Sequence, residues 1–334
     1  MIELTRNSLR FTFPEIHPEA ELFIGFQRTL RIPDDDNIYP LPPGLDSFPL
    51  KHIDDYEVPA SWLERGGVML PMYQSEALWI NFDSPHIRNR GTNYPFAIKI
   101  AAGKINAVSG DQWDDELHRN PQDYLVSTEQ PWLDGYSVKK GLIRQFVAMP
   151  LGSGYSAEEQ LTGKAEHGGL QIIVYPMKAE VFEKRFPIYD PELYSKREEI
   201  LYCLSPDMGL APGGKMKQKI YRDPFNFSDW DHNTSSRCFV HIANSLVWRA
   251  ITGENPPATP ITAKEYNDYD LPWFDYYDDN TAALEGSATL AVKLKSIMQK
   301  AQEKKDNPLP ENESVKPENM KIIKDVRKVR EGRF

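Results

Sequence analysis

A thiol, an imidazole and an amide stand close together in the segment 238–244. Cys238, His241 and Asn244 are the residue types that a cysteine hydrolase uses as nucleophile, base and orienting group. In a helix they would share one face, whereas in a strand Cys238 and His241 would point to opposite faces. We favour the interpretation that this is an ordinary core element whose histidine has its hydrogen-bond partners. A hydrolase centre is the alternative hypothesis.

A second candidate for chemistry is His167, which stands in the segment EHGG (166–169). An imidazole beside two glycines can serve as a general base or a ligand, and it is equally typical of a solvated turn. The seven histidines are scattered, without an H-x-H or H-x-x-x-H pair. We therefore expect no metal site and no cofactor. His167 remains a candidate catalytic residue for the same hydrolase hypothesis.

Tryptophan and tyrosine are concentrated beside aspartate in the segments FNFSDW (225–230) and WFDYYDD (273–279). Such side chains can stack on a sugar and bond its hydroxyls, or form a protein interface. They can also form a satellite core whose polar tips reach water. The leading hypothesis is a binding or interaction protein for a protein, small-molecule or sugar ligand. Its expected contact residues are Trp230, Trp273, Asp275, Tyr276 and Tyr277.

Composition excludes several classes of protein. The 334 residues carry a net charge of −10, which repels the phosphates of nucleic acids. The chain has two cysteines, too few for a disulfide framework, so a reducing compartment is expected. No apolar run approaches about 18 residues, and the N-terminal residues do not resemble a signal peptide. We expect a soluble cytoplasmic protein without a membrane span.

The elements that would position these residues are organised around Gly141–Met177. Two apolar runs of strand length, Leu142–Met149 and Leu170–Tyr175, flank a short helix. Ser156 and Glu159 form an S-x-x-E capping box at the start of that helix, and a glycine can end it. The sequence therefore predicts strand, short helix and strand.

The predicted fold class is α+β. Residues 1–186 are rich in short, alternating apolar segments and form a β-rich part. We expect it to pack against a mixed part, 187–305, and to share one core with it. The mixed part should end in a long helix over Thr281–Lys305, because apolar residues recur there at helical spacing.

Residues 306–334 are expected to form a linker and a basic tail. In the tail, Ile322, Val326 and Val329 would share one face of a short amphipathic helix. A basic helix could dock on the acidic body or on a sister subunit. An assembly component that forms a homo-oligomer through this tail is therefore a third hypothesis.

Three segments resemble a group of bacterial hypothetical proteins. They are LPMYQSEALWINF (70–82), QFVAMPLGSGYSAEEQLTG (145–163) and SRCFVHIANSLVWRAITGENPP (236–257). The resemblance extends over most of residues 20–290 and implies an ordered, recurring fold without an activity. Some members carry the label of integral membrane protein, which the hydropathy of this chain contradicts.

Overall fold

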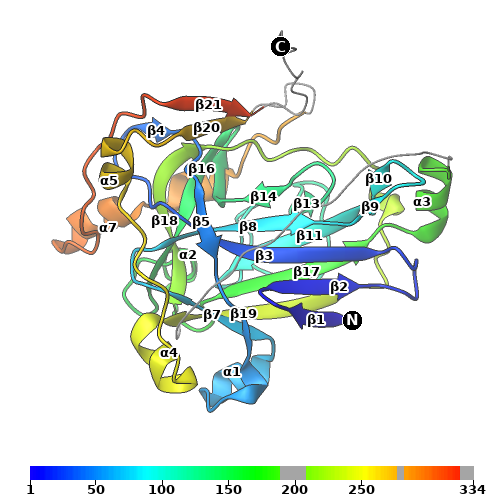
Figure 1. Cartoon of the computed structure of the whole chain (residues 1–334), viewed down its shortest axis with the longest axis horizontal. Coiled ribbons are helices and arrows are strands. Elements are labelled where there is room, and N and C mark those ends of the chain that lie inside the picture. The colour runs from blue at the N-terminus through cyan, green and yellow to red at the C-terminus, as the bar shows by residue number, and fades with distance from the viewer. Residues whose placement is uncertain (189–207, 277–281, 324–334) are drawn as a thin grey trace, which may run out of the picture.

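Two β-sheets stack face to face and form the body of the molecule, with short helices around the edges (Figure 1). The computed structural model describes residues 1–188, 208–276 and 282–323. Strands and helices are mixed along the chain, so the fold class is α+β. In the described ranges no helix is long and apolar enough to cross a membrane.

The first sheet has ten strands, with the central order β1-β2-β3-β8-β16-β18-β4. β5 pairs with β3, β14 with β8 and β15 with β16, and only the β4–β18 pair is parallel. Its members are β1 (Ile2–Thr5), β2 (Ser8–Thr12), β3 (Glu21–Thr29), β4 (Ile38–Tyr39), β5 (Gly44–Ser47), β8 (Ala77–Asp83), β14 (Trp132–Leu133), β15 (Gly135–Lys139), β16 (Leu142–Pro150) and β18 (Met208–Lys217).

The second sheet has seven strands, with the central order β12-β11-β17-β19-β7-β6 and with β13 paired to β11. The β7–β19 pair is parallel. Its members are β6 (Lys51–His52), β7 (Val68–Met72), β11 (Phe96–Ala102), β12 (Ile105–Asn106), β13 (Leu125–Val126), β17 (Leu170–Pro176) and β19 (Ser236–Asn244).

The remaining elements are short and lie outside the two sheets. Two strand pairs, β9–β10 and β20–β21, stand apart from them. They comprise β9 (His86–Ile87), β10 (Thr92–Asn93), β20 (Trp273–Tyr276) and β21 (Met320–Ile323). The helices are α1 (Ala60–Arg65), α2 (Ala157–Thr162), α3 (Ala179–Arg185), α4 (Ser245–Thr252), α5 (Ala263–Asp268), α6 (Ala288–Lys293) and α7 (Ile297–Lys304), with 3-10 turns at Ile53–Asp55 and Phe227–Asp229.

Strand alternation explains why the sheets pack as they do. In β3, Leu22, Ile24 and Phe26 point into the core, and in β8 Leu78 and Ile80 do the same. The residues between them point outward, because successive side chains of a strand lie on opposite faces. One hydrophobic cluster contains residues from both sheets and from both sides of residue 187. The largest cluster therefore joins the two predicted parts, and two smaller clusters lie beside it.

The central strand–helix–strand prediction is confirmed. The first apolar run is β16, the helix is α2 and the second run is β17. Both bonds of the Ser156–Glu159 capping box are present, and Gly163 ends α2 in the left-handed conformation, with φ 72°. β16 belongs to the ten-stranded sheet and β17 to the seven-stranded sheet. This stretch therefore carries the chain from one sheet to the other.

The prediction of a long C-terminal helix over Thr281–Lys305 is wrong. Two short helices, α6 and α7, occupy the segment, and residue 281 lies outside the described residues. The break follows from local chemistry. Leu294 takes an extended conformation, and Ser296 starts a new helix by accepting a hydrogen bond from the backbone N–H of Gln299.

The segment after α7 packs on the body instead of acting as a free linker. Leu309 and Val315 are buried, and Asn312 accepts a hydrogen bond from the backbone N–H of Asp34 at 2.9 Å. Residues 320–323, expected in an amphipathic helix, form strand β21, which pairs in parallel with β20. The rest of the predicted tail helix, 324–334, lies outside the described residues.

Candidate functional site

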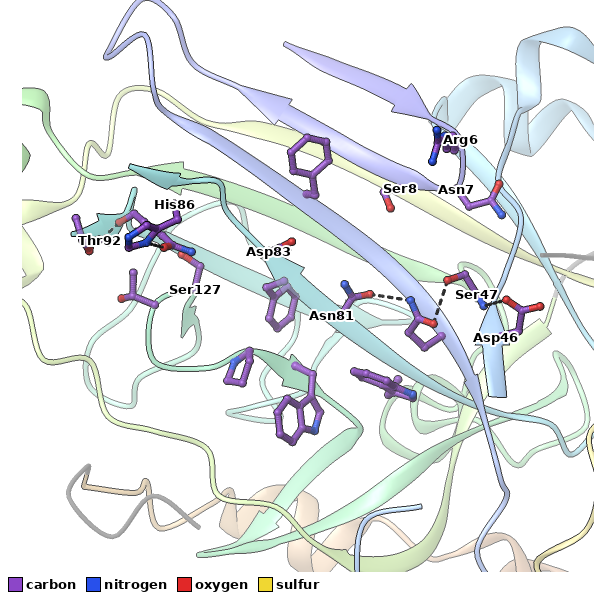
Figure 2. A pocket seen from close by; sticks show the side chains of 18 of the residues that line it. Arg6, Asn7, Ser8, Asp46, Ser47, Asn81, Asp83, His86, Thr92 and Ser127 are labelled. Carbon is purple, nitrogen blue, oxygen red and sulfur yellow. Dashed lines mark hydrogen bonds between the residues drawn. The ribbon is translucent and has the colours of Figure 1, made fainter. Parts of the chain in front are cut away.

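An open groove of about 880 Å³ lies on the outer face of the ten-stranded sheet. Figure 2 shows it from close by, with Asp46 and Ser47 at one end, Asn81 between, and His86, Thr92 and Ser127 at the other end. Its lining comes from the β1–β2 turn, β3, β5, β8, the β9–β10 hairpin, residues 127–128 and the segment that leads into β14. The groove is thus built from segments that are distant in sequence.

The strand register places the lining side chains in rows across the sheet. Ser8 of β2 stands opposite Gly25 of β3, Gly25 opposite Asn81 of β8, and Asn81 opposite Trp132 of β14. Because these residues occupy outward positions of adjacent strands, they form a continuous floor. A second row contains Ser47, Gln27 and Trp79 in the same way.

A chain of hydrogen bonds orients the polar groups of the floor (Figure 2). The Ser47 hydroxyl donates to Oε1 of Gln27 at 3.0 Å, and Nε2 of Gln27 donates to Oδ1 of Asn81 at 3.3 Å. The Asn81 amide is therefore held with its oxygen towards Gln27. Among the described residues, no hydrogen bond engages Nδ2 of Asn81, so its two protons can be offered to a ligand.

Gly25 makes the space in which the Asn81 amide lies. A Cβ atom at residue 25 would collide with Oδ1 of Asn81, and its other neighbours are atoms of the same amide. A side chain at this position would therefore displace the amide from the floor. The glycine is required here by close approach, not by an unusual backbone conformation.

Two half-buried tryptophans form the aromatic part of the groove. The rings of Trp79 and Trp132 meet edge to face, with centroids 6.1 Å apart and an interplanar angle of 77°. Trp79 lies over the backbone of Gly44, where a Cβ would come within 3.3 Å of its ring. The carbonyl oxygen of Trp132 accepts hydrogen bonds from the amides of Gln130 and Gln218. These contacts hold the backbone of Trp132 and place the ring of Trp79 against Gly44.

Asp134 is buried behind Trp132. Its backbone N–H donates to Oε1 of Gln218 at 3.0 Å, and its carboxylate accepts from Nε2 of Gln218 at 2.7 Å. Burial raises the pKa of Asp134 to about 7, and the Trp132 side chain, as a hydrogen-bond donor, acts in the opposite direction. The carboxyl group therefore belongs to the support of the groove and changes charge near neutral pH.

The hairpin at the other end of the groove presents a histidine. Nδ1 of His86 lies 3.0 Å from Oδ1 of Asn93, and Nδ2 of Asn93 donates to the carbonyl oxygen of Ser84 at 2.6 Å. The exposed imidazole is thereby fixed in orientation while one of its edges stays directed away from these partners. Arg6, Asp46 and Asp83 add charges of both signs to the lining.

The structure does not bring Cys238 and His241 together. They lie on opposite faces of β19: Cys238 points into the core, and burial raises the pKa of its thiol to about 12. His241 is stacked between Trp62 and Phe239, and burial lowers its pKa to about 4. Asn244 caps α4 through its side-chain oxygen. A buried thiol without a base is not a nucleophile.

His167 lies in a partly buried turn and lines none of the described cavities. The carbonyl oxygens of Glu166 and His167 accept hydrogen bonds from the guanidinium of Arg65. Burial lowers the pKa of the imidazole. The loop is thus tied to α1, and its histidine is not joined to a candidate nucleophile in the described part of the chain.

The expected aromatic–acidic surface is not present at Trp230 and Trp273. Both tryptophans are core residues, 0% and 1% exposed. The indole of Trp230 donates to Oδ2 of Asp223 at 3.0 Å, so this nearby carboxylate satisfies a buried N–H group and is not offered to a ligand. Asp275 is 9% exposed, and its carboxylate lies 3.3 Å from Nζ of Lys217.

Two further predicted contact residues cannot be placed in a site. Tyr276 is the last residue of β20, and the structure describes its backbone only. Tyr277 lies outside the described residues.

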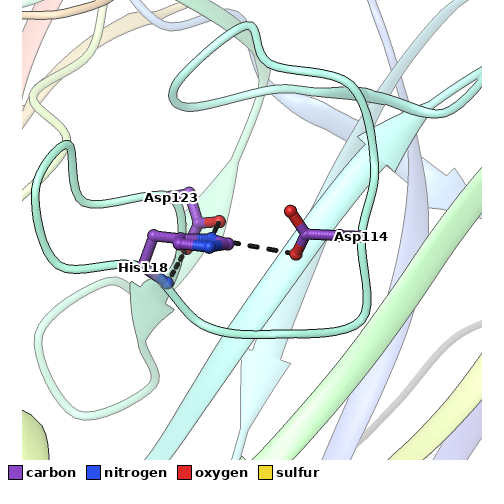
Figure 3. A group of neighbouring side chains, drawn as sticks. All are labelled: Asp114, His118 and Asp123. Atoms are coloured by element: carbon purple, nitrogen blue, oxygen red, sulfur yellow. Dashed lines mark hydrogen bonds and ion pairs between the residues drawn. The ribbon is translucent and has the colours of Figure 1, made fainter.

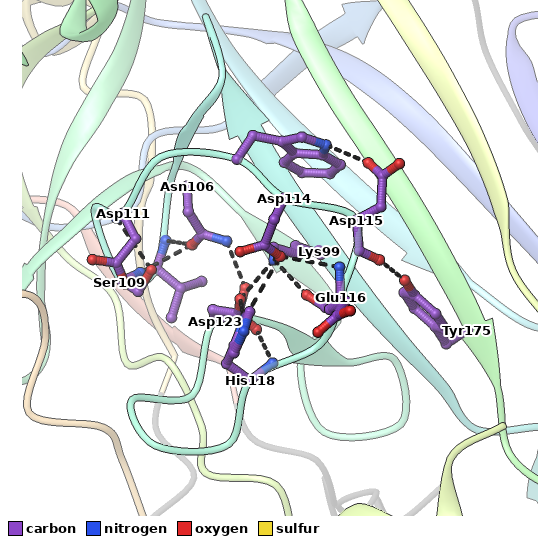
Figure 4. A network of polar contacts seen from close by, with 12 residues as sticks. Lys99, Asn106, Ser109, Asp111, Asp114, Asp115, Glu116, His118, Asp123 and Tyr175 are labelled. Carbon is purple, nitrogen blue, oxygen red and sulfur yellow. Dashed lines mark hydrogen bonds and ion pairs between the residues drawn. The ribbon is translucent and has the colours of Figure 1, made fainter. Parts of the chain in front are cut away.

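A cluster with the residue types of a metal site lies in the loop after β12. Asp114, His118 and Asp123 bring their ligand atoms within 4.8 Å of one another (Figure 3). Nζ of the buried Lys99 lies 2.7 Å from Asp114 and 2.8 Å from Asp123 (Figure 4). The ammonium already supplies the positive charge that a metal ion would bring. The cluster is therefore an ion-pair network that holds this loop on β11.

One signal in the sequence points towards the groove. The segment EALWINF (76–82) alternates, and its outward residues are Trp79 and Asn81. Trp79 and Asn81 therefore stand on the same outward side of one strand, where one ligand could contact both. Their partners could not be found in this way, because strand pairing joins Trp79 and Asn81 to residues more than 50 positions away.

Comparisons with protein-family models, curated proteins and solved structures found no match. The functional argument therefore depends on the geometry and chemistry of the groove alone.

Proposed function

We propose that the chain is a binding protein whose groove on the ten-stranded sheet takes a neutral oligosaccharide. The observation that carries this proposal is the pair of half-buried tryptophans beside an oriented amide in one open groove. The class of function is the one expected from the sequence, a binding protein with a sugar among its possible ligands. The site, however, differs from the one expected there.

The two kinds of lining match the two kinds of surface on a sugar ring. The faces of the ring carry C–H groups that can pack on an indole, and its rim carries hydroxyls that can both donate and accept hydrogen bonds. Asn81 offers a donor beside the tryptophans, and Gln27 and Ser47 keep it in place. An open groove also admits a chain of several rings, whereas a closed cavity would select a single small molecule.

Charge favours a neutral ligand over a polyanion. Asp46 and Asp83 outnumber Arg6 among the charged lining residues, and the whole chain has a net charge of −10. A phosphorylated or sulfated polymer would be repelled by this field. A cysteine hydrolase, the alternative, draws no support from the buried and separated Cys238 and His241.

Affinity gel electrophoresis with neutral polysaccharides tests the proposal. The panel contains cellulose derivatives, xylan, mannan, starch and a gel without polymer. We expect one polymer to retard the wild-type protein and to lose this effect on W79A and W132A. Tyr269→Ala is the matched control, because Tyr269 is 74% exposed and lies outside the groove. Equal mobility of wild type and both tryptophan variants in every gel would contradict the proposal.

A further inference from the structure

The hydrogen bonds around His86 determine which of its nitrogens carries a proton. The carbonyl oxygen of Ser84 can only accept, so the NH₂ group of Asn93 must face it, at 2.6 Å. The amide oxygen of Asn93 then faces Nδ1 of His86, at 3.0 Å, and an oxygen in this position requires Nδ1 to be the donor. The neutral imidazole therefore has its lone pair on Nε2.

Nε2 of His86 has no hydrogen bond within the described part of the chain, and His86 is an exposed residue of the groove lining (Figure 2). We infer that His86 is a specificity-determining residue of the groove, whose Nε2 accepts a hydrogen bond from a hydroxyl of the bound oligosaccharide. This inference rests on the proposed function and adds which protein group contacts the ligand at the hairpin end of the groove.

The groove then presents three different groups, with Asn81 opposite Trp132 and His86 at the hairpin end. The tryptophans offer apolar faces, Asn81 offers a donor, and His86 offers an acceptor. Along β8, residues two apart are about 7 Å from each other, so Trp79 and Asp83 are separated by about 13 Å and His86 lies beyond them. A ligand that touches both ends must contain more than one sugar ring. It must also carry a free hydroxyl at the end near His86.

Two substitutions of His86 test whether the hydrogen-bond acceptor of the side chain, or only its planar ring, contributes to binding. His86→Phe keeps a planar ring and removes the acceptor, whereas His86→Gln places an amide oxygen near the position of Nε2. Because His86 is exposed, both variants should fold like the wild type, which a thermal melt verifies. Isothermal titration calorimetry is carried out with cellohexaose, xylohexaose, mannohexaose and maltohexaose. The tightest of the four is used for the comparison.

We expect H86F to bind this hexasaccharide about two- to tenfold more weakly than the wild type, since one hydrogen bond is lost. H86Q should retain most of the affinity. Wild-type affinity in H86F, or an equal loss in H86F and H86Q, would overturn the inference while W132A still loses binding. Failure of all four hexasaccharides to bind the wild-type protein would instead contradict the proposed function, and the inference with it.

Discussion

At the scale of single residues, two outward glycines and one buried carboxylate determine the shape of the groove. Gly25 admits the Asn81 amide to the floor, and Gly44 admits the ring of Trp79. Asp134 supports the segment that carries Trp132. These residues do not have to touch a ligand to influence its affinity, because each determines where a contacting group lies.

The first prediction concerns Gly25. In G25A the added methyl group displaces the Asn81 amide, and we expect oligosaccharide affinity to fall about two- to tenfold, as for the loss of one hydrogen bond. Stability should change little, because the methyl group meets the end of a half-buried side chain that can turn away. Calorimetric titration of G25A, N81A and the double variant checks the reason. If the double variant loses the sum of both single effects, Gly25 does not act through Asn81.

The second prediction concerns the pH dependence that Asp134 confers. Burial raises its folded-state pKa to about 7, well above the value of about 3.9 in an unfolded chain. Between these values the folded protein holds a proton that the unfolded chain lacks. The free energy of unfolding therefore falls as pH rises through this window, by at most ~4 kcal/mol from this group.

Asp134→Asn removes this dependence. The stability of D134N relative to the wild type should therefore increase between pH 4.5 and pH 8, as measured by urea unfolding. Glu76, another buried carboxyl group with a pKa raised to about 7, is present in both proteins and cancels in the comparison. An equal difference between the two proteins at both pH values would show that Asp134 keeps its ordinary pKa.

At the scale of elements, the sequence predicted single helices and strands from local signals, but it did not predict which strands pair. The capping box of α2 and the alternation of β8 are contained in a few neighbouring residues, and both occur as the sequence indicates. The long helix fails because Ser296, a good cap, starts a second helix inside the apolar pattern. Spacing alone cannot decide between one continuous helix and two capped ones.

The expectation of a binding surface at Trp230 and Trp273 failed for a related reason. A tryptophan next to aspartates has the same composition whether the acids face a ligand or satisfy a buried indole. Trp230 and Asp223 follow the second pattern, since the carboxylate also accepts from the hydroxyl of Tyr124. Only the tertiary structure separates the two cases, and the same holds for the rows Gly25–Asn81–Trp132 that form the groove.

The third prediction concerns the loop that Lys99 holds. Lys99 is 1% exposed and pairs with Asp123, which is almost as buried. In K99M the carboxylate of Asp123 loses this partner in a poorly solvated place, and we expect a loss of about 3–5 kcal/mol in urea unfolding. Lys140→Met, which breaks an exposed pair with Glu285, is the control and should change little. Similar stabilities of K99M and K140M would contradict the structural role of the network.

At the scale of the whole molecule, the open groove lies on the outer face of the ten-stranded sheet, and the C-terminal segment packs on another part of the body. Residues 306–323 contribute buried Leu309 and Val315, and Asn312 bonds both Asp34 and Arg31. Strand β21 of this segment pairs in parallel with β20. The segment is therefore part of the folded body.

The fourth prediction follows from this packing. A chain that ends at Asp306 loses two buried apolar side chains, each contributing about 1.5–3 kcal/mol, and its melting temperature should fall by several degrees. Asn312→Ala removes only the side-chain hydrogen bonds of residue 312 and should show a smaller decrease. A melting temperature equal to that of the full chain would contradict the packing.

Light scattering of the same truncated chain also tests the third hypothesis, assembly through the tail, which predicts a change in mass.

The central claim is that the outer face of the ten-stranded sheet is a carbohydrate-binding surface. It is tested most directly by oxidising tryptophan with N-bromosuccinimide in the presence and absence of each hexasaccharide, and by locating the modified residues by mass spectrometry. Trp79 and Trp132 are half-buried in the groove, Trp113 is half-buried elsewhere, and Trp62, Trp230, Trp248 and Trp273 are buried. We predict that one hexasaccharide protects Trp79 and Trp132 and leaves Trp113 as reactive as before. Protection of Trp113 alone, or of no tryptophan by any hexasaccharide, would contradict the assignment of the groove.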